Sequence, residues 1–243
     1  MADIAYKRIL VKLSGEALIG QQESGIDPVM VDKLATELIG LHQAGVEIGV
    51  VVGGGNLFRG AALAAAGLDR VTADHMGMLA TVMNALALQD SLLRQGADAA
   101  VLTGLEMPQV CDRYTQRDAR RRISAGEILV FAGGTGNPFF TTDTGASLRA
   151  VEIQADLLIK ATKVDGIYDK DPVKHSDAVR YTQLDFDQAI TQRLAVMDVA
   201  AMILCNDNGL DLAVCDINHA GALLELASGK SVGTRVTRKE VKQ

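Results

Sequence analysis

Short apolar runs alternate with helix-like segments along most of this chain of 243 residues. A continuous apolar run is typical of a strand that is buried on both faces of a parallel sheet. We predict such strands at 8–13, 48–52, 99–103, 128–132, 157–159 and 212–215, and helices at about 28–44, 74–95, 117–122, 142–154, 185–193, 198–208 and 219–228. Residues 165–172 are predicted as a turn-rich loop or hairpin, and the tail after Gly233 as an edge strand. The alternation predicts an α/β fold in which helices cover both faces of a mainly parallel sheet.

Composition narrows the class of protein. Hydrophobic residues make up 48% of the chain, and 24 Lys and Arg stand against 30 Asp and Glu, for a net charge of −6. This balance excludes a disordered chain and argues against a nucleic-acid partner. Without an apolar run of about 18 residues, or the apolar core of a signal peptide, we expect no membrane span and no secretion. Three cysteines without a C-x-x-C pair favour a reducing cytoplasm over a disulfide or zinc framework.

Glycine clusters stand directly after three of the predicted strands. Ser14-Gly15 follows the first strand, Gly53–Gly55 the second and Gly133–Gly136 the fourth. Ligands of open α/β sheets bind beyond the carboxyl ends of the strands, where successive glycine amides can converge on an anion. Neither a P-loop nor a Rossmann fingerprint is complete, because Ala61-Ala62 replaces Lys-Ser/Thr and Phe139 replaces the third glycine. The sequence therefore predicts a phosphate ligand at this edge of the sheet, without either of these motifs.

Two cationic side chains accompany the glycine turns. Lys12 lies in an otherwise apolar strand, near its carboxyl end. An unpaired buried ammonium group is costly, so we expect Lys12 to reach an anion such as a transferring phosphoryl group. The alternative is a lysine that pairs with a nearby carboxylate. Arg59 follows the second glycine cluster and can hold a phosphate with two hydrogen bonds, unless it is simply exposed after a tight turn.

Two later segments combine groups that suit a nucleotide. Residues 134–143 bring together hydroxyls, an amide, two phenylalanines and an acid. This mixture fits a ribose or a planar base, although a capped loop between a strand and a helix has the same composition. In 162–172, Tyr168 can pack on a purine and Asp171 can contact a ribose. An Asp-Gly turn explains much of that second segment without any ligand.

Five motifs that include most of these residues stand in order along the chain. They are Lys12–Ala17, Gly53–Gly60, Asp74–Thr81, Gly134–Asp143 and Lys160–Gly166. In this order they resemble the bacterial UMP kinases, a group within the amino acid kinase family, and the resemblance runs essentially from end to end. The runs Asp-His-Met-Gly-Met and Gly-Thr-Gly-Asn-Pro-Phe-Phe separate the chain from relatives that form acyl phosphates.

The resemblance implies one domain over residues 1–243 with a three-layer αβα sandwich. Its N-terminal part would bind UMP and its C-terminal part ATP. The reaction would be the reversible transfer of the γ-phosphoryl group of ATP to UMP, with Mg²⁺, in pyrimidine nucleotide biosynthesis. The family also implies a cytoplasmic homohexamer that GTP activates and UTP inhibits. The segment from Gly20 to Gly25 corresponds to one that is linked to GTP activation.

The positions of the motifs imply which residues serve each nucleotide. ATP would be bound by Lys12, Leu13, Ser14, Gly15, Gly55, Arg59, Thr162, Tyr168 and Asp171. UMP would be bound by Gly54, Asp74, Thr135, Gly136, Asn137, Pro138, Phe139, Phe140, Thr141 and Thr142. Asp74 would accept the ribose hydroxyls, and Arg59 would serve UMP as well as ATP.

Transfer between two nucleotides poses mainly an electrostatic problem, because two polyanions must meet. The acceptor phosphate has its second pKa at about 6 and is ionised at neutral pH, so no histidine base is required. We expect Lys12 and Arg59 to neutralise charge and Asp156 to hold Lys12 in place. Asp143 or Asp198 would contribute to the metal shell. Each of these three acids also has a plainer interpretation, as a helix cap.

Two other functions stay open on the sequence. A carboxylate kinase of the same fold would make an acyl phosphate instead of a nucleoside diphosphate. A non-catalytic nucleotide-binding relative would keep the fold for storage or regulation. Loss of Lys12 or Arg59 would favour that relative, and both residues are present.

Overall fold

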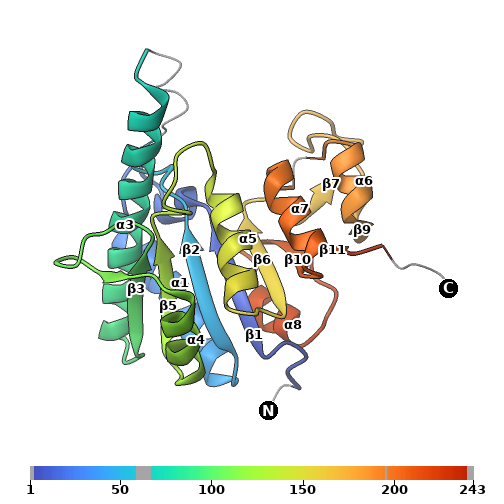
Figure 1. The fold of residues 1–243 in the computed structure, drawn as a ribbon. Coiled ribbons are helices and arrows are strands. Elements are labelled where there is room, and N and C mark those ends of the chain that lie inside the picture. Colours follow the sequence, from blue (N-terminus) through green and yellow to red (C-terminus); the bar gives the residue numbers. More distant parts are fainter. Residues whose placement is uncertain (1–2, 59–66, 195, 240–243) are drawn as a thin grey trace.

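A nine-stranded sheet forms the centre of the molecule, in the order β4-β3-β5-β2-β1-β6-β10-β11-β9 (Figure 1). The computed structural model describes residues 3–58, 67–194 and 196–239. Neighbouring strands run parallel, except for β10 and β11. The predicted, mainly parallel sheet is confirmed. Its strands are β1 (Arg8–Leu13), β2 (Glu47–Val52), β3 (Ala99–Thr103), β4 (Asp112–Arg113), β5 (Ile128–Ala132), β6 (Leu157–Thr162), β9 (Gln183–Asp185), β10 (Asp211–Asp216) and β11 (Thr234–Thr237).

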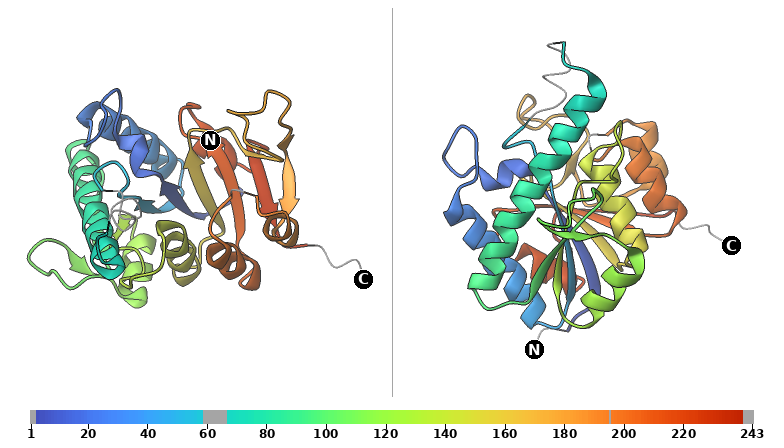
Figure 2. Two further views of the ribbon diagram at one scale, coloured as in Figure 1. Left: turned by 90° about the horizontal axis from the view of Figure 1, so that it is seen from above. Right: turned by 60° about the vertical axis from the view of Figure 1, so that its left-hand side comes forward.

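Helices cover both faces of the sheet, which gives the predicted three layers (Figures 1 and 2). One face carries α1 (Pro28–Gln43), α3 (Arg70–Arg94), α8 (Ala222–Ala227) and the 3₁₀ helix η1 (Gly15–Leu18). The other face carries α4 (Gln116–Ser124), α5 (Thr142–Glu152), α6 (Phe186–Thr191) and α7 (Val199–Asp207). β7 (Ile167–Tyr168) and β8 (Arg180–Tyr181) form a separate antiparallel pair, of which only β7 falls within 165–172, where a loop or hairpin was predicted.

Two apolar cores, one on each face of the sheet, decide where the strand side chains point. In β1, Ile9 and Val11 belong to the core under α1 and α3, whereas Leu10 belongs to the core under α5. Side chains alternate along a strand, so Lys12 points to the α5 face. β6 has the same alternation, and its Lys160 is the register partner of Lys12. Two lysines therefore stand side by side near the carboxyl edge of the central strands.

Two of the predicted elements differ from the prediction, and the short strands β4 and β9 were not predicted. α3 begins at Arg70 rather than at 74, because the Asp69 carboxylate accepts a hydrogen bond from the amide of Thr72 and caps the helix one turn earlier. β11 is not an edge strand, because β9 pairs with its outer side. β9 has three residues and β4 only two, which is too short for either to show a hydrophobic period in the sequence.

The longest helix, α3, is apolar enough to cross a membrane by length and composition alone. An 18-residue window in it reaches a mean hydropathy of 1.2. Half of that window is buried in the structure, where α3 packs on α1, β3 and β5. Core helices of soluble proteins pass the same test, so α3 is only weak support for a membrane span.

The tight packing of Gly233, in the turn before β11, can be tested by mutation. Gly233 has a φ of +69°, and a Cβ there would lie 1.9 Å from the carbonyl oxygen of Val214 in β10. We predict that Gly233→Ala lowers the free energy of unfolding by about 2–4 kcal/mol, because a backbone clash adds to the strain of a left-handed residue. Unfolding in urea measures the loss.

Gly209→Ala is the matched control. Its φ is +66°, but among the described residues no atom lies within 4 Å of the added Cβ. This change should therefore cost only about 1 kcal/mol, from backbone strain alone. Equal losses for the two variants would show that the clash at Gly233 has no effect.

Candidate functional site

The glycine loops meet at the carboxyl edge of the sheet, as the sequence predicts. A Cβ on Gly15, after β1, would lie 2.5 Å from the carbonyl oxygen of Gly53, after β2. A Cβ on Gly54 would lie 2.8 Å from the carbonyl oxygen of Gly77 in α3. These distances leave no room for a side chain, so glycine is required for the loops to touch. At Gly55, within the described part of the chain, the space beside the Cα atom is open.

Buried polar side chains of α3 hold two of these loops. Asn84 donates to the carbonyl of Gly53 at 2.7 Å and exchanges hydrogen bonds of 2.7 and 3.0 Å with Asn56. The hydroxyl of Thr81 accepts a hydrogen bond of 2.9 Å from the amide of Gly133. Buried polar groups that lose a partner are costly. The loops are therefore held in one conformation before any ligand binds.

The charged centre of the site is Asp143 with the two lysines of the central strands. Lys12 Nζ lies 2.8 Å from Oδ1 of Asp143, and Lys160 Nζ lies 2.9 Å from Oδ2. The side chains of Lys12, Asp143 and Lys160 are only 11%, 15% and 18% exposed. Burial opposes ionisation of Asp143, but the two ammonium groups outweigh it and hold the pKa of the carboxyl below its usual value. For Lys160, burial lowers the pKa although Asp143 attracts the proton.

The cap of α5 explains how Asp143 reaches the lysines. Thr141 caps this helix by accepting from the amides of Asp143 and Thr144, so Asp143 is not the cap that its plainer interpretation offered. The carboxylate of Asp143 is therefore available to turn toward the sheet. Asp198 caps α7 and also accepts from the hydroxyls of Thr144, at 2.8 Å, and Thr141. Asp198 thus joins α5 to α7 beside the charged centre.

A pocket of about 300 Å³ opens between α3 and the loop that joins β5 to α5. Arg70 and Thr81 of α3 form part of its wall. The residues in its lining that the sequence predicted for UMP are Asp74, Thr135, Asn137, Phe140, Thr141 and Thr142. Gly136, Pro138 and Phe139 lie in the same loop but outside the lining.

Asp74 stands in this pocket with two partners. Its Oδ2 atom accepts a hydrogen bond of 2.8 Å from the amide of Phe139, and Arg70 Nε lies 2.9 and 2.8 Å from Oδ1 and Oδ2. Burial raises the pKa of Asp74, but the Phe139 amide and the Arg70 guanidinium outweigh it, so that the pKa lies below its usual value. The ionised carboxylate can act only as an acceptor, which suits hydroxyl groups of a ligand.

A second pocket, of about 420 Å³, lies past the end of β6. Tyr168 and Asp171, which the sequence predicted for ATP, both line it, and residues 192–194 form another part of its wall. Thr162 ends β6, two residues before Val164, the first residue of the lining. The lining of this pocket therefore includes an aromatic ring and a carboxylate.

The predicted contact between Asp156 and Lys12 is wrong. Asp156 precedes β6 at the amino edge of the sheet, where its carboxylate accepts a hydrogen bond of 2.8 Å from the amide of Arg8. Lys12 lies at the other end of the neighbouring strand. Asp143 holds Lys12 instead, because the first turn of α5 stands above the carboxyl edge.

The remaining predicted residues are distributed around the same edge. The Leu13 side chain is buried in the core under α1 and α3, so only its backbone can meet a ligand. Ser14 caps η1. Gly20 and Gly25 lie in the loop between η1 and α1, both with positive φ. Arg59 lies outside the described residues.

Sequence reasoning missed two residues of the site. Lys160 lies in a buried strand near its carboxyl end, which is the same signal that singled out Lys12. Arg70 stands four residues before Asp74, and opposite charges at this spacing meet on one face of a helix. Both signals were therefore present in the sequence, in the 157–162 strand and in the 70–74 segment.

The residues of the site can hold a metal ion only together with the phosphates of a bound nucleotide. In the part of the chain that the structure describes, no three His, Cys, Asp or Glu side chains form a cage for a metal. Asp143 Oδ1 is buried, and its contact with Lys12 is a charge contact rather than a directed hydrogen bond, which leaves acceptor capacity. Magnesium in nucleotide sites is held by one or two carboxylates together with phosphates and water. Asp143 and Asp198 are the carboxylates that fit this role.

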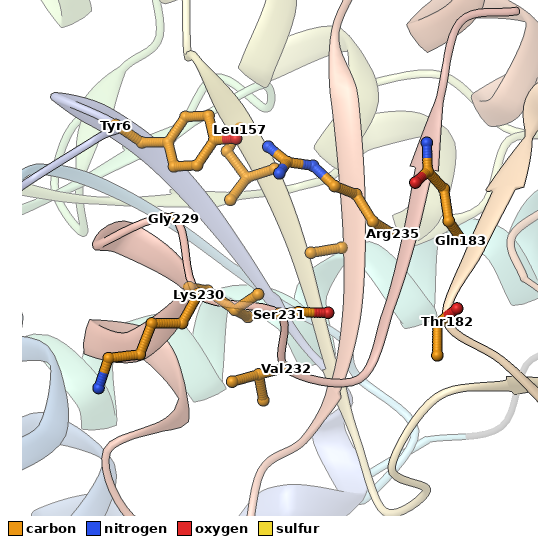
Figure 3. Close-up of a pocket in the computed structure, with 11 residues that line it drawn as sticks. Tyr6, Leu157, Thr182, Gln183, Gly229, Lys230, Ser231, Val232 and Arg235 are labelled. Atoms are coloured by element: carbon orange, nitrogen blue, oxygen red, sulfur yellow. The ribbon is translucent and has the colours of Figure 1, made fainter.

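A third pocket, of about 250 Å³, lies at the amino edge of the sheet, beside the start of β6 (Figure 3). Arg235 lies over the ring of Tyr6, with its guanidinium carbon 5.1 Å from the ring centroid, and Leu157 lies next to them. None of the residues predicted for the site belongs to this lining. The candidate site is therefore the pair of pockets at the carboxyl edge.

Comparisons with known proteins identify the family of this chain. Residues 7–216 match the amino acid kinase family. The chain is 56% identical to a uridylate kinase of Xanthomonas euvesicatoria, over 97% of this chain and 98% of the relative, and 56% identical to one of Methylococcus capsulatus, over 96% and 98%. The crystal structure of a UMP kinase from Bacillus anthracis matches with a TM-score of 0.93 and 34% identity over 97% of both chains. That of a UMP kinase from Ureaplasma parvum matches with a TM-score of 0.89 and 32% identity, over 96% of this chain and 99% of its own. This chain therefore belongs to the amino acid kinase family and, within it, to the group of the bacterial uridylate kinases.

Proposed function

We propose that this chain is a UMP kinase, which transfers the γ-phosphoryl group of ATP to UMP and forms UDP and ADP. The observation that carries this proposal is the Lys12–Asp143–Lys160 cluster, whose residues are neighbours along the chain of residues that line both pockets. Thr141 and Thr142 of the first pocket directly precede Asp143, and Val164 of the second follows the strand that holds Lys160. The names of the relatives support the same function.

We assign UMP to the pocket between α3 and the β5–α5 loop, and ATP to the pocket past β6. Asp74 would accept the ribose hydroxyls of UMP, and Tyr168 and Asp171 would contact the adenine and ribose of ATP. The N-terminal part of a single domain over 1–243 would thus supply most of the UMP site and the C-terminal part most of the ATP site. Backbone amides would serve the phosphates, from Leu13, Ser14, Gly15, Gly54 and Gly55, with Gly136, Pro138, Phe139 and Thr162 completing the two sites.

The reaction follows from the charges. An oxygen of the UMP phosphate, already ionised at neutral pH, attacks the γ-phosphorus of ATP. The bond between that phosphorus and the β–γ bridging oxygen breaks, and ADP leaves with the bond electrons. Lys12 would stabilise the charge that develops on the transferring phosphoryl group. Lys160 would add a second positive charge, and Arg59 would bind the phosphates. No residue needs to remove a proton.

Asp143 is the residue that positions the ammonium groups of Lys12 and Lys160. Its carboxylate contacts both ammonium groups, so each lysine keeps one orientation near the strand ends. The pKa of Asp143 lies below its usual value, so the carboxylate stays ionised throughout the neutral range. Asp198 would hold the first turn of α5 in place through Thr141 and Thr144.

Mg²⁺ would enter with ATP and screen the charge of its phosphates. Asp143 and Asp198 are the carboxylates that would face it. Asp156 stands at the other edge of the sheet and takes no part in this proposal.

We also propose that the chain acts as a cytoplasmic homohexamer, with GTP as activator and UTP as inhibitor. Support for self-association comes from an apolar stripe on α3, where Met76, Leu79 and Met83 are 39%, 47% and 55% exposed. The segment from Gly20 to Gly25 would transmit the effector signal. The carbonyl of Gly25 accepts a hydrogen bond of 2.9 Å from Asn56, which connects this segment to the Gly53 loop.

The molecule that accepts the phosphoryl group distinguishes a UMP kinase from the other candidate functions. An assay of ADP release with Mg-ATP and different acceptors identifies that molecule. We expect turnover with UMP and little with CMP, AMP or GMP, and a higher rate when GTP is added. A folded protein that turns over none of these nucleotides would contradict the kinase assignment. An acyl phosphate product, trapped as a hydroxamate, would indicate a carboxylate kinase instead.

Lys12→Ala should lower kcat by about 10²–10³-fold and raise the KM values far less, because Lys12 acts on charge that develops in transfer. Steady-state kinetics with varied ATP and UMP measure both effects. Lys7→Ala is the control, since Lys7 is exposed just before the amino end of the same strand. A near-normal kcat for Lys12→Ala would exclude the proposed role.

The lowered pKa of Lys160 predicts an alkaline limit to activity. Its ammonium is charged at low pH and loses its proton as the pH rises, earlier than an exposed lysine with a pKa of about 10.4. We expect kcat to fall on the alkaline side, below that value. Lys160→Arg keeps the positive charge and should move the decline to higher pH. An alkaline limb that is the same in both proteins would assign the decline to another group.

A further inference from the structure

Arg70 contacts Asp74, the carboxylate that we propose binds the ribose, and it does not belong to the Lys12–Asp143–Lys160 cluster. It opens α3, four residues before Asp74, so both side chains lie on one face of the helix. The Nε atom lies 2.9 and 2.8 Å from the two carboxylate oxygens. The Asp74 side chain is 14% exposed and that of Arg70 is 51% exposed. This ion pair is partly buried in the pocket wall, unlike an ordinary exposed pair on a helix.

The same pair holds a strained residue of the β5–α5 loop. Phe139 has a φ of +72°, which is uncommon for a residue with a side chain. Its amide donates to Asp74 Oδ2 at 2.8 Å, and the Arg70 guanidinium carbon lies 5.6 Å from the centroid of its ring. Such a conformation persists only when the surrounding contacts impose it. Arg70 and Asp74 supply two of those contacts from across the pocket.

A carboxylate held at both oxygens is suited to a vicinal diol. Each oxygen can accept further hydrogen bonds beside those from Arg70 and Phe139. The 2′ and 3′ hydroxyls of a ribonucleotide can both donate to it, whereas a 2′-deoxyribonucleotide supplies only one donor. Hydrogen bonds to a charged acceptor are strong, but only when the acceptor is correctly oriented. The orientation of Asp74 therefore decides how much the second hydroxyl contributes.

We infer that Arg70 is a positioning residue that orients Asp74 and the Phe139 loop so that the site prefers a ribonucleotide acceptor over its 2′-deoxy form. This inference rests on the proposed UMP kinase function and names a specificity determinant within it. Arg70 acts through Asp74 rather than on the transferring phosphoryl group.

The test compares kcat/KM for UMP and 2′-deoxy-UMP at saturating Mg-ATP. The proteins are the unmodified chain, Arg70→Gln, Asp74→Asn and the double variant. Arg94→Gln is the control, because Arg94 lies on the same helix, away from the pocket, and forms ion pairs with Asp90 and with Asp32 of α1. Arg70→Lys keeps the charge and serves as a second probe if Arg70→Gln does not fold.

We expect the unmodified chain to prefer UMP by about 10- to 100-fold, the range of one hydrogen bond to a charged group. Arg70→Gln should reduce this preference at least fivefold, through a higher KM for UMP, with kcat and the KM for ATP within about twofold. Arg70→Lys should keep an intermediate preference. Adding Arg70→Gln to Asp74→Asn should cause no further loss of preference, because both act through one carboxylate.

Three results would overturn the inference. One is an unmodified chain without any preference, and another is an Arg70→Gln variant that keeps the full preference. The third is a variant that loses UMP and 2′-deoxy-UMP turnover equally, which would mean a direct contact with phosphate or base, or a purely structural role. Failure of the proposed function is distinct, because the unmodified chain would then turn over neither nucleotide.

Discussion

Two like charges on neighbouring strands impose the constraint on which the rest of the site depends. Lys12 and Lys160 are register partners, and neighbouring strands lie about 5 Å apart. At a similar distance two ammonium groups repel by roughly 3 kcal/mol at an effective dielectric constant of about 20. Asp143 offsets this repulsion by contacting both groups, and the three together keep one net positive charge. A cation that is buried in this way is satisfied by an anion, and glycine loops of this kind have backbone amides that can bind one.

The rest of the architecture keeps this arrangement in place. Thr141 caps α5 and so leaves Asp143 to face the sheet, while Asp198 connects α5 to α7. On the other face, Asn84 and Thr81 of α3 hold the loops after β2 and β5. Both faces of the sandwich thus converge on one edge of the sheet. Each pocket is connected to the charged centre along the chain, because Thr141 and Thr142 of the first directly precede Asp143 and Val164 of the second follows β6.

Much of the fold and part of the site could be predicted because their signals are local. Continuous apolar runs identified the longer strands, and glycines after them identified the binding edge. Three predictions failed for non-local reasons. Asp156 stands near β6 in sequence but at its amino end, α3 begins at Arg70 rather than at 74 because Asp69 caps it, and β9 covers the outer side of β11. Each outcome depends on which groups meet after the chain has folded.

Residue types and spacing alone were enough to predict a parallel α/β sheet and the edge at which its glycine turns lie, because strand burial and glycine turns are properties of short segments. The order of the strands and the partners of each charge were decided only in three dimensions. Asp143 lies 131 positions from Lys12 in the numbering, and Phe139 lies 65 from Asp74. Contacts across such distances depend on strand order and helix caps, which set the direction of a side chain and have no period along the chain.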